Sequence, residues 1–308
     1  MALIKSVKQS LFKRWDRKSS LLLGLSGGPD SIALLYALLD LKIKPIIAHI
    51  DHGWRQESAS EADYLSKLAH DLNLAFFTTT LTPPIKNLED QSRKDRFLFF
   101  QKVYRENQCQ ALLLAHHNDD VVETSLQRLF EGAHLPFLGG IREEQHLWQM
   151  QVWRPLVGVC KAEILKFLEE KKLSYFQDPT NLDKRFLRGR VRLFVHQLET
   201  TFKKNFRNNL AIFAARSEEL KSYLEKRTEE HHRRRKVVEN TICWDVEGLE
   251  KIEARFLLQR SVGSIPRAVL DGVVDASFSQ LKGKRFAAKG MEWTVFAKHI
   301  TLKINDLR

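Results

Sequence analysis

Short apolar runs alternate with longer amphipathic segments over the first 131 residues of the chain. Four apolar runs have the length and composition of buried strands: residues 21–25, 45–50, 75–80 and 111–115. Four other segments carry apolar positions at helical spacing: residues 31–42, 58–72, 92–106 and 119–131. This alternation predicts an α/β fold with a doubly wound, mostly parallel, Rossmann-like sheet. Ligands of such sheets bind beyond the carboxyl ends of the strands, so the segments after residues 25, 50 and 115 are candidate sites.

The pattern changes near residue 200. Residues 201–236 are polar with helical spacing and end in the charged run EKRTEEHHRRRK, which indicates a connecting helix. Beyond residue 241 the patterns are shorter and mixed, and KGKRFAAKGMEWTVFAKHITLKI is typical of hairpin strands. We therefore expect two domains: an α/β domain over residues 1–210, and a linker helix with a smaller basic domain over residues 211–308.

Positive charge is concentrated in this second part. The chain has 50 Lys and Arg against 38 Asp and Glu, a net charge of +12. Residues 1–200 hold 28 basic and 24 acidic side chains, whereas residues 201–308 hold 22 and 14. A basic surface favours a nucleic-acid partner, although solvated helix faces produce the same count.

The composition disfavours proteins built on disulfides or a zinc ribbon, and it disfavours membrane-spanning or secreted proteins. The cysteines Cys109, Cys160 and Cys243 are scattered without a CxxC pair, which argues against a disulfide framework and a zinc ribbon. No apolar run approaches the roughly 18 residues of a membrane span, and residues 1–20 are basic and amphipathic without a small-residue cleavage site. We expect a soluble, cytoplasmic protein.

A glycine-rich turn, SGGPDS, joins the first predicted strand to the first predicted helix. Its glycines let the backbone approach a ligand at the positive start of a helix, its serines offer hydroxyls, and its proline suits the first helical turn. The candidate phosphate-binding residues are Ser26, Gly27, Gly28, Pro29, Asp30 and Ser31. Asp30 could also hold a divalent cation against the phosphates. No lysine follows as in GxxxxGK[ST], and an ordinary turn capped by Asp30 and Ser31 is the alternative.

A second polar segment, AHHNDDVVET, follows the fourth predicted strand. Asp120 and Glu123 are three residues apart on a predicted helix, so they share a face and could grip an ammonium group. Acids at a helix start are also stabilised by the helix dipole in any protein, and His116 with Asp120 could be a metal pair. The residues alone leave these three interpretations open.

Both segments resemble a known family. The SGGPDS turn resembles the PP-loop of enzymes that cleave ATP between its α- and β-phosphates, and AHHNDDVVETSLQRLFEGAHLPFLGGI (115–141) resembles the tRNA(Ile)-lysidine synthases. Partial support comes from HIDHGWRQES (49–58), LEDQSRKDRF (88–97), WRPL (153–156) and DPTN (178–181). The resemblance covers most of residues 20–195. Beyond them only the layout of a linking helix and a small C-terminal domain matches, as in the family's shorter form.

The resemblance implies an adenine nucleotide alpha hydrolase-like fold and a ligase that uses ATP and magnesium. It implies that the wobble cytidine of an isoleucine tRNA with anticodon CAU is adenylated at O2, and that lysine then displaces AMP at C2 to give lysidine. The loop would bind ATP, with Asp30 as the magnesium ligand. Residues 1–210 would be the catalytic domain, and residues 211–308 would hold the tRNA.

The resemblance also implies roles for single residues. Asp120 and Glu123 would bind L-lysine, and His116 would help at the transfer step. Arg188, in the segment KRFLRGRVR, would neutralise charge that develops on the α-phosphate. A basic helix face lying on RNA is the alternative for Arg188. Residues 49–55 would border the nucleotide, or form a loop whose Trp54 packs down. Arg93 and Arg96 would contact phosphates or be solvated charges.

The chain departs from the family's pattern at five positions. Val121 stands where Gln is common, Glu131 where Arg is common, and Gly189 where Asn is usual. His134 and Phe137 stand where glycines are frequent.

Two competing functions remain at this point. A tRNA thiolase of the same superfamily would deliver sulfur to the activated cytidine, but the thiolases of closest pattern use paired cysteines. A nucleotide-sensing RNA-binding protein would keep the fold without catalysis.

Overall fold

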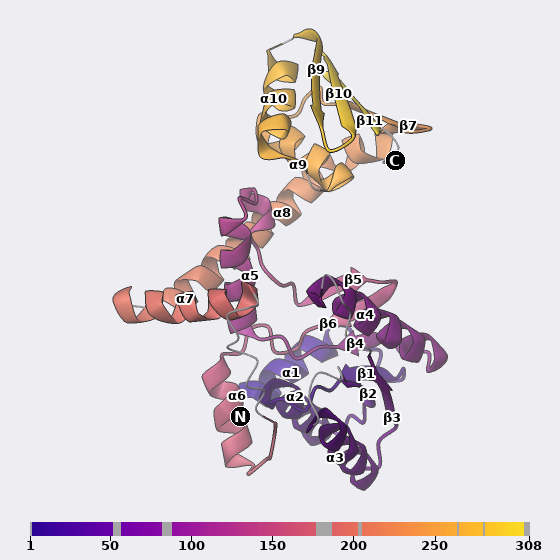
Figure 1. Ribbon diagram of the computed structural model, residues 1–308, viewed down its shortest axis with the longest axis vertical. Coiled ribbons are helices and arrows are strands. Elements are labelled where there is room, and N and C mark those ends of the chain that lie inside the picture. Colours follow the sequence, from indigo (N-terminus) through magenta and orange to yellow (C-terminus); the bar gives the residue numbers. More distant parts are fainter. Residues whose placement is uncertain are drawn as a thin grey trace. The chain divides into compact units, whose positions relative to one another are not determined.

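The computed structural model describes residues 2–51, 57–81, 88–176, 187–202, 205–263, 265–279 and 281–304 (Figure 1). It divides into two compact units. The first comprises Met1–Gln127 and Gly139–Ala214, and the second comprises Arg128–Leu138 and Ala215–Arg308. Of the described helices, none combines the length and the apolar character that crossing a bilayer requires.

A six-stranded sheet forms the centre of the first unit. Its order is β3 (Phe76–Thr80), β2 (Ile46–Asp51), β1 (Leu21–Gly24), β4 (Ala111–Leu113), β6 (Met150–Trp153) and β5 (Glu144–Leu147). The first five strands pair in parallel, and only β5 is antiparallel to its neighbour. The predicted parallel sheet is therefore confirmed. The strand order reverses direction between β1 and β4, which is where doubly wound sheets bind ligands.

Successive strand residues point to opposite sides of this sheet, so its apolar strands present an apolar surface on both faces. Helices cover both of these faces. On one face, Leu21 and Leu23 pack in a core with helices α1 (Ala2–Phe12), α2 (Pro29–Asp40), α3 (Glu57–Asp71) and α6 (Lys161–Glu170). On the other face, Leu22 packs with α4 (Leu88–Glu106). Helices α5 (Asn118–Phe130) and α7 (Leu187–Phe202) share a separate small cluster that includes Val122 and Val195.

Two ion pairs join the helices α2 and α6, one near each end. Asp30 meets Lys161 at 2.5 Å near the start of both helices, and Asp40 meets Lys171 at 2.7 Å near their ends. The helices therefore run in the same direction. Only the first of these pairs lies at the carboxyl edge of the sheet, beside the β1–α2 loop.

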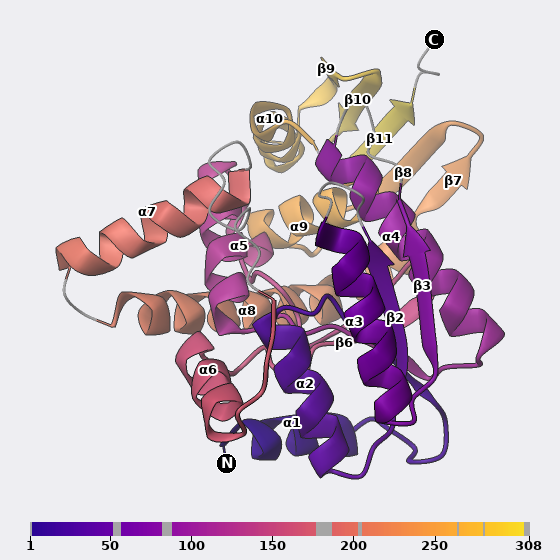
Figure 2. The same ribbon diagram turned by 60° about the horizontal axis from the view of Figure 1, so that its bottom comes forward.

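The second unit contains an antiparallel sheet and two helices. The strand order is β7 (Lys236–Val238), β8 (Thr241–Asp245), β11 (His299–Ile304), β10 (Met291–Phe296) and β9 (Lys282–Ala288). Helices α9 (Lys251–Val262) and α10 (Arg267–Phe278) pack in its core, where the stacked rings of Trp244 and Trp293 are 5.9 Å apart. Figure 2 shows α10 beside β9 and β10. The predicted hairpin strands are present as β9, β10 and β11.

Helix α8 (Phe206–Arg234) is the predicted connecting helix. The sequence predicts a domain boundary at residue 210, and the division of the chain into compact units falls within α8, between Ala214 and Ala215. The segment Arg128–Leu138, which includes the short helix η1 (Leu135–Phe137), belongs to the second unit. No local pattern in the sequence marks that assignment.

Candidate active site

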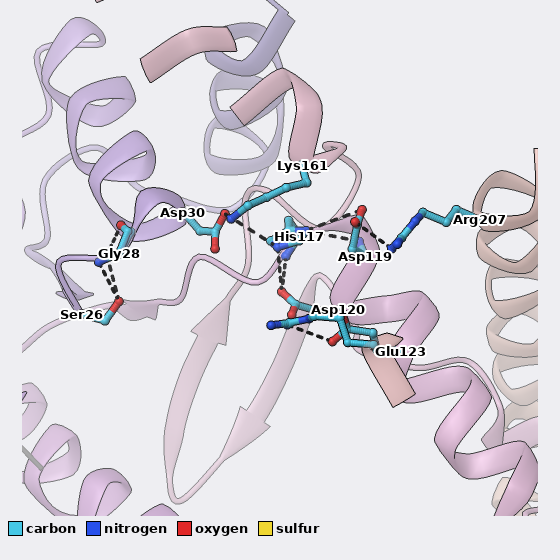
Figure 3. A network of polar contacts seen from close by, with 11 residues as sticks. Ser26, Gly28, Asp30, His117, Asp119, Asp120, Glu123, Lys161 and Arg207 are labelled. Carbon is cyan, nitrogen blue, oxygen red and sulfur yellow. Dashed lines mark hydrogen bonds and ion pairs between the residues drawn. The ribbon is translucent and has the colours of Figure 1, made fainter. Parts of the chain in front are cut away.

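The predicted phosphate cradle lies between β1 and α2, at the carboxyl edge of the sheet (Figure 3). Gly28 is the N-cap residue of α2 and Pro29 is its first residue, where the missing proline N–H costs nothing. The Ser31 hydroxyl donates to the Gly28 carbonyl at 3.0 Å and lies 3.1 Å from the Ser26 hydroxyl. These contacts hold the loop around the positive end of α2, an arrangement that attracts anions.

Gly27 is the residue in this loop that cannot carry a side chain. Its φ of +78° lies in the left-handed region, and a Cβ there would come 2.6 Å from the ring of Phe176. The Phe176 amide also donates to the Gly27 carbonyl at 2.9 Å. The shape of the loop therefore depends on glycine at this position.

We expect Gly27→Ala to destabilise the protein by about 1–3 kcal/mol, because it combines backbone strain with a steric overlap. Thermal or urea unfolding measures this loss. Gly28→Ala is the matched control, because its Cβ would meet only the Ser26 hydroxyl at 3.5 Å and Gly28 has an ordinary φ of −72°. Equal stability of the two variants would contradict the argument.

Asp30 is the centre of a polar network that two other elements complete. Its Oδ1 atom lies 2.5 Å from Nζ of Lys161, the first residue of α6, and 3.7 Å from Nε2 of His117 (Figure 3). The Asp30 and Lys161 side chains are 28% and 32% exposed, so both remain accessible to a ligand. A lysine thus reaches this loop from a residue 131 positions later in the chain, although the loop itself contains none.

His117 links Asp30 to the acids of α5. Its backbone amide donates to Oδ2 of Asp120 at 2.9 Å, and its Nδ1 accepts the Asp119 amide at 3.3 Å. In the neutral ring the proton is therefore on Nε2. That Nε2 atom lies 3.7 Å from a carboxylate oxygen of both Asp30 and Asp120. The imidazole side chain lies between these two carboxylates. It is only 7% exposed, so this part of the site is partly desolvated.

Asp120 and Glu123 lie on one face of α5, as predicted, and both are buried. Glu123 is bound by an arginine of α7: Arg192 donates Nε to Oε1 at 2.7 Å and Nη2 to Oε2 at 3.1 Å. Burial lowers the pKa of Arg192, but the hydrogen bonds and charge of Glu123 outweigh burial and raise that pKa. Glu123 is thus held by a two-point, charge-assisted contact.

Asp119 turns away from this pair and faces α8. Its Oδ2 atom lies 2.9 Å from Nη1 of Arg207, which also contacts Glu199 at 2.6 Å. This ion pair fixes the start of α5. The alternative of a stabilised helix start describes Asp119 and also Asp120, whose Oδ2 accepts the His117 amide just before α5 at 2.9 Å. Asp120 in addition faces Nε2 of His117.

The catalytic residues expected from the sequence are Asp30, His116, Asp120, Glu123 and Arg188. The structure brings Asp120 and Glu123 together with Asp30, and places His116 half-buried just after β4. The side chain of Arg188 is outside the described residues, so its role stays a prediction. The network contains three residues that were not named as site residues: His117, Lys161 and Arg192. Arg192 is one helical turn after Arg188, a spacing that could have identified it.

The partial motifs border the same edge of the sheet. His49 donates Nδ1–H to the Leu25 carbonyl at 2.8 Å, and burial lowers its pKa. Arg154 of the WRPL motif is 4% exposed and donates to the Arg142 carbonyl. Burial, and then the charge of Arg93, lowers the Arg154 pKa to about 10. Residues 52–56 and the DPTN motif are outside the described residues.

The metal interpretation of His116 with Asp120 gains no support. No group of three or more His, Cys, Asp or Glu side chains in the described ranges could hold a metal ion. A magnesium ion does not require such a cluster, because it is commonly held by one or two carboxylates together with substrate phosphates. Asp30 alone could serve as that carboxylate.

The family model of the PP-loop domain matches residues 2–199, well over half of the chain. The chain therefore carries a PP-loop ATP-binding domain. It is 40% identical to the tRNA(Ile)-lysidine synthase of Protochlamydia amoebophila, with 71% of this chain and 50% of that protein covered. It is 39% identical to the corresponding protein of Chlamydia pneumoniae, with 71% of this chain and 70% of that protein covered. The chain belongs to the tRNA(Ile)-lysidine synthase family, and the family expected from its motifs is confirmed.

The length of the relatives differs. The chain spans half the length of the Protochlamydia protein that it matches, and 70% of the Chlamydia protein. Among solved structures, the U34-tRNA thiolase NcsA from Methanococcus maripaludis aligns with a TM-score of 0.57 at 20% identity. That alignment covers 71% of this chain and 80% of the thiolase, and it shows a shared fold.

Proposed function

We propose that the chain ligates lysine to C2 of the wobble cytidine in an isoleucine tRNA with anticodon CAU. The products are lysidine, AMP and pyrophosphate. Beyond the family, one observation carries this proposal: Asp30 of the phosphate loop and Asp120 of the acid pair lie on either side of one imidazole, 3.7 Å from its Nε2. A site for ATP and a site for an amine are thus adjacent. We assign the ATP chemistry to the first unit and tRNA binding to the second, and we place the reaction in the cytoplasm.

The first step transfers AMP to the RNA. Cytidine O2 attacks the α-phosphorus, a new O–P bond forms, and the bond to the β-phosphate oxygen breaks to release pyrophosphate. The backbone amides at the start of α2 would bind the triphosphate. Lys161 would release its ion-pair partner Asp30 and bind a phosphate oxygen instead. Asp30 would hold magnesium, which neutralises phosphate charge when bound. Arg192 or Arg188 would complement the charge on the α-phosphate.

The second step uses the acid pair. Asp120 and Glu123 bind the lysine ammonium, and a carboxylate accepts one of its protons so that a neutral amine attacks C2. The C2–N bond forms, and the bond from C2 to the AMP oxygen breaks. His117 keeps the two sites apart by directing its Nε2–H between Asp30 and Asp120, and His116 would assist at this transfer.

The cysteines give little support to the thiolase alternative. Burial raises the pKa of Cys109 to about 11, which keeps it a poorly reactive thiol at neutral pH. Cys160 is exposed beside α6, and Cys243 lies in the second unit. They are not arranged as a pair.

Incubation with ATP, magnesium, the isoleucine tRNA and labelled lysine tests the proposal. We expect label in the RNA, with one AMP and one pyrophosphate released per lysine incorporated. Sulfur-dependent modification without lysine incorporation would indicate the thiolase, and ATP binding without pyrophosphate release would indicate a nucleotide sensor. Either result would overturn the proposal.

We expect Lys161→Met to slow pyrophosphate release by about 10²-fold, because it removes a preorganised cation from the phosphate site. Release of pyrophosphate in single-turnover reactions measures this. Lys171→Met is the matched control, since Lys171 forms an equivalent ion pair with Asp40 at the other end of the same two helices. A similar loss in both variants would show that the effect comes from helix packing and not from phosphate contact.

A further inference from the structure

The second unit contains a cavity that the proposed chemistry does not use. Its volume is about 330 Å³, and it lies between the 134–137 turn and helices α9 and α10. Apolar side chains form much of its lining, and the polar ones are His134, Arg255, Gln259, Arg267 and Asp271. Every lining residue belongs to the second unit, so the cavity is complete within it. We name it the second-unit pocket.

The walls of the second-unit pocket are preformed. The rings of Phe137 and Phe256 stack with their centroids 5.4 Å apart and an interplanar angle of 21°. The turn that carries Phe137 is held at two carbonyls: Ser217 donates to Leu135, and Arg128 donates to Phe137 at 3.1 Å. An aromatic wall on a fixed turn can accept a planar ligand without rearrangement.

Two buried polar atoms in this lining lack a hydrogen-bond partner among the described residues. They are Nε2 of His134 and Oε1 of Gln259. Burial, with the charges of Arg267 and Arg255, outweighs Asp271 and lowers the pKa of His134, which favours the neutral form of its ring. The Gln259 oxygen requires a donor, and a neutral imidazole nitrogen can donate or accept. Buried polar groups of this kind are normally satisfied, so they point to a ligand that carries hydrogen-bonding edges.

One cation of the lining is placed to meet an anion. Arg255 donates to Asp271 at 2.7 Å and lies 3.7 Å from Asp275, so it is held between two carboxylates. Arg267 lies 3.7 Å from Asp271 and its side chain is 73% exposed. Arg267 can turn toward a phosphate at the entrance without losing a buried contact.

We propose that the second-unit pocket binds one unpaired nucleotide of the tRNA. The base lies against the aromatic wall with its edge toward Gln259 and His134, and its phosphate meets Arg267. This inference rests on the proposed function, because it takes the RNA to be the substrate. The volume lies at the lower end of the range of about 300–1,000 Å³ for ligand pockets, which suits a single nucleotide. Unpaired RNA bases are read by this combination of aromatic contact and edge hydrogen bonds.

Filling the pocket tests the proposal. Ile252 is a lining residue that is 44% exposed, so Ile252→Trp can occlude the cavity without removing a charge or a core side chain. We expect about 10-fold weaker tRNA binding, with ATP affinity and melting temperature unchanged. Ile304→Trp is the matched control, since Ile304 is 41% exposed on β11 and does not line the pocket. Gln259→Leu should weaken binding in the same direction without changing the salt dependence.

Crosslinking supplies an independent measurement. Ultraviolet irradiation of the tRNA complex should attach a nucleotide to a peptide containing His134 or Phe137, and Ile252→Trp should abolish that product. Wild-type tRNA affinity in Ile252→Trp, or crosslinks confined to other peptides, would overturn the proposal. So would binding of free AMP or CMP that Ile252→Trp abolishes while tRNA affinity is unchanged. If tRNA binding depends on the pocket but no lysine is incorporated, the proposed function fails and the pocket assignment stands.

Discussion

Asp30→Ala is expected to reduce pyrophosphate release by about 10³-fold or more, the largest effect that we predict for a single substitution in this chain. Asp30 contacts both Lys161 and His117, and in the proposed mechanism it would hold magnesium against the phosphates. Its removal would delete this proposed cation site and would release Lys161 from its partner. Pyrophosphate release with saturating ATP and tRNA measures this loss.

Asp40→Ala provides the comparison. Asp40 lies on the same helix and pairs with Lys171 at 2.7 Å, so its loss changes helix packing without touching the loop. We expect Asp40→Ala to keep pyrophosphate release within a few-fold of wild type. Full activity of Asp30→Ala would remove the basis for placing the nucleotide at this loop.

Glu123→Gln is expected to raise the lysine concentration needed for half-maximal ligation by about 10²-fold while tRNA adenylation continues. The substitution removes the negative charge that would hold the lysine ammonium, but leaves the loop and Asp30 unchanged. It also weakens a buried contact with Arg192, so we expect a loss of stability of about 1–3 kcal/mol. Pyrophosphate release without lysine, and lysine incorporation at increasing lysine concentrations, separate the two effects.

Glu253→Gln separates lysine binding from stability. Glu253 is 4% exposed and pairs with Arg227 at 2.8 Å in the second unit, so it is a buried glutamate in a similar ion pair. We expect Glu253→Gln to lower stability without changing the use of lysine. An unchanged lysine requirement in Glu123→Gln would contradict the assignment of the acid pair.

The sheet of the first unit was predictable because its signal is local. Buried parallel strands are short apolar runs, and their positions in the sequence agree with β1 to β4 within two residues. The pair β5 and β6 was not predicted, because Glu144–Leu147 is an edge strand with alternating exposure and little apolar character. The sequence pattern indicates α1 only as an amphipathic segment and α7 only through the basic helix face considered for Arg188, and it does not indicate α6.

The site was predictable only in part, because some of its contacts join distant segments. The SGGPDS turn and the acid pair each have a signature within ten residues. Lys161 meets Asp30 across 131 positions and Arg192 meets Glu123 across 69, so no local spacing reveals either contact, although the one-turn spacing from Arg188 marks Arg192 itself as a candidate. His116 and His117 are adjacent, and the sequence alone cannot tell which ring faces Asp30. The conformation of the backbone turn after β4 determines that it is the ring of His117.

These long separations also affect how the protein is made. The contacts described at the carboxyl edge of the sheet draw on β1, the turn after β4, and the first turns of α6 and α7. A ribosome-bound chain that has not yet exposed Arg192 lacks one partner of the buried carboxylate, so its acid pair is incompletely neutralised. We therefore expect the polar network at this edge of the sheet to reach its native arrangement only after Arg192 has left the ribosome.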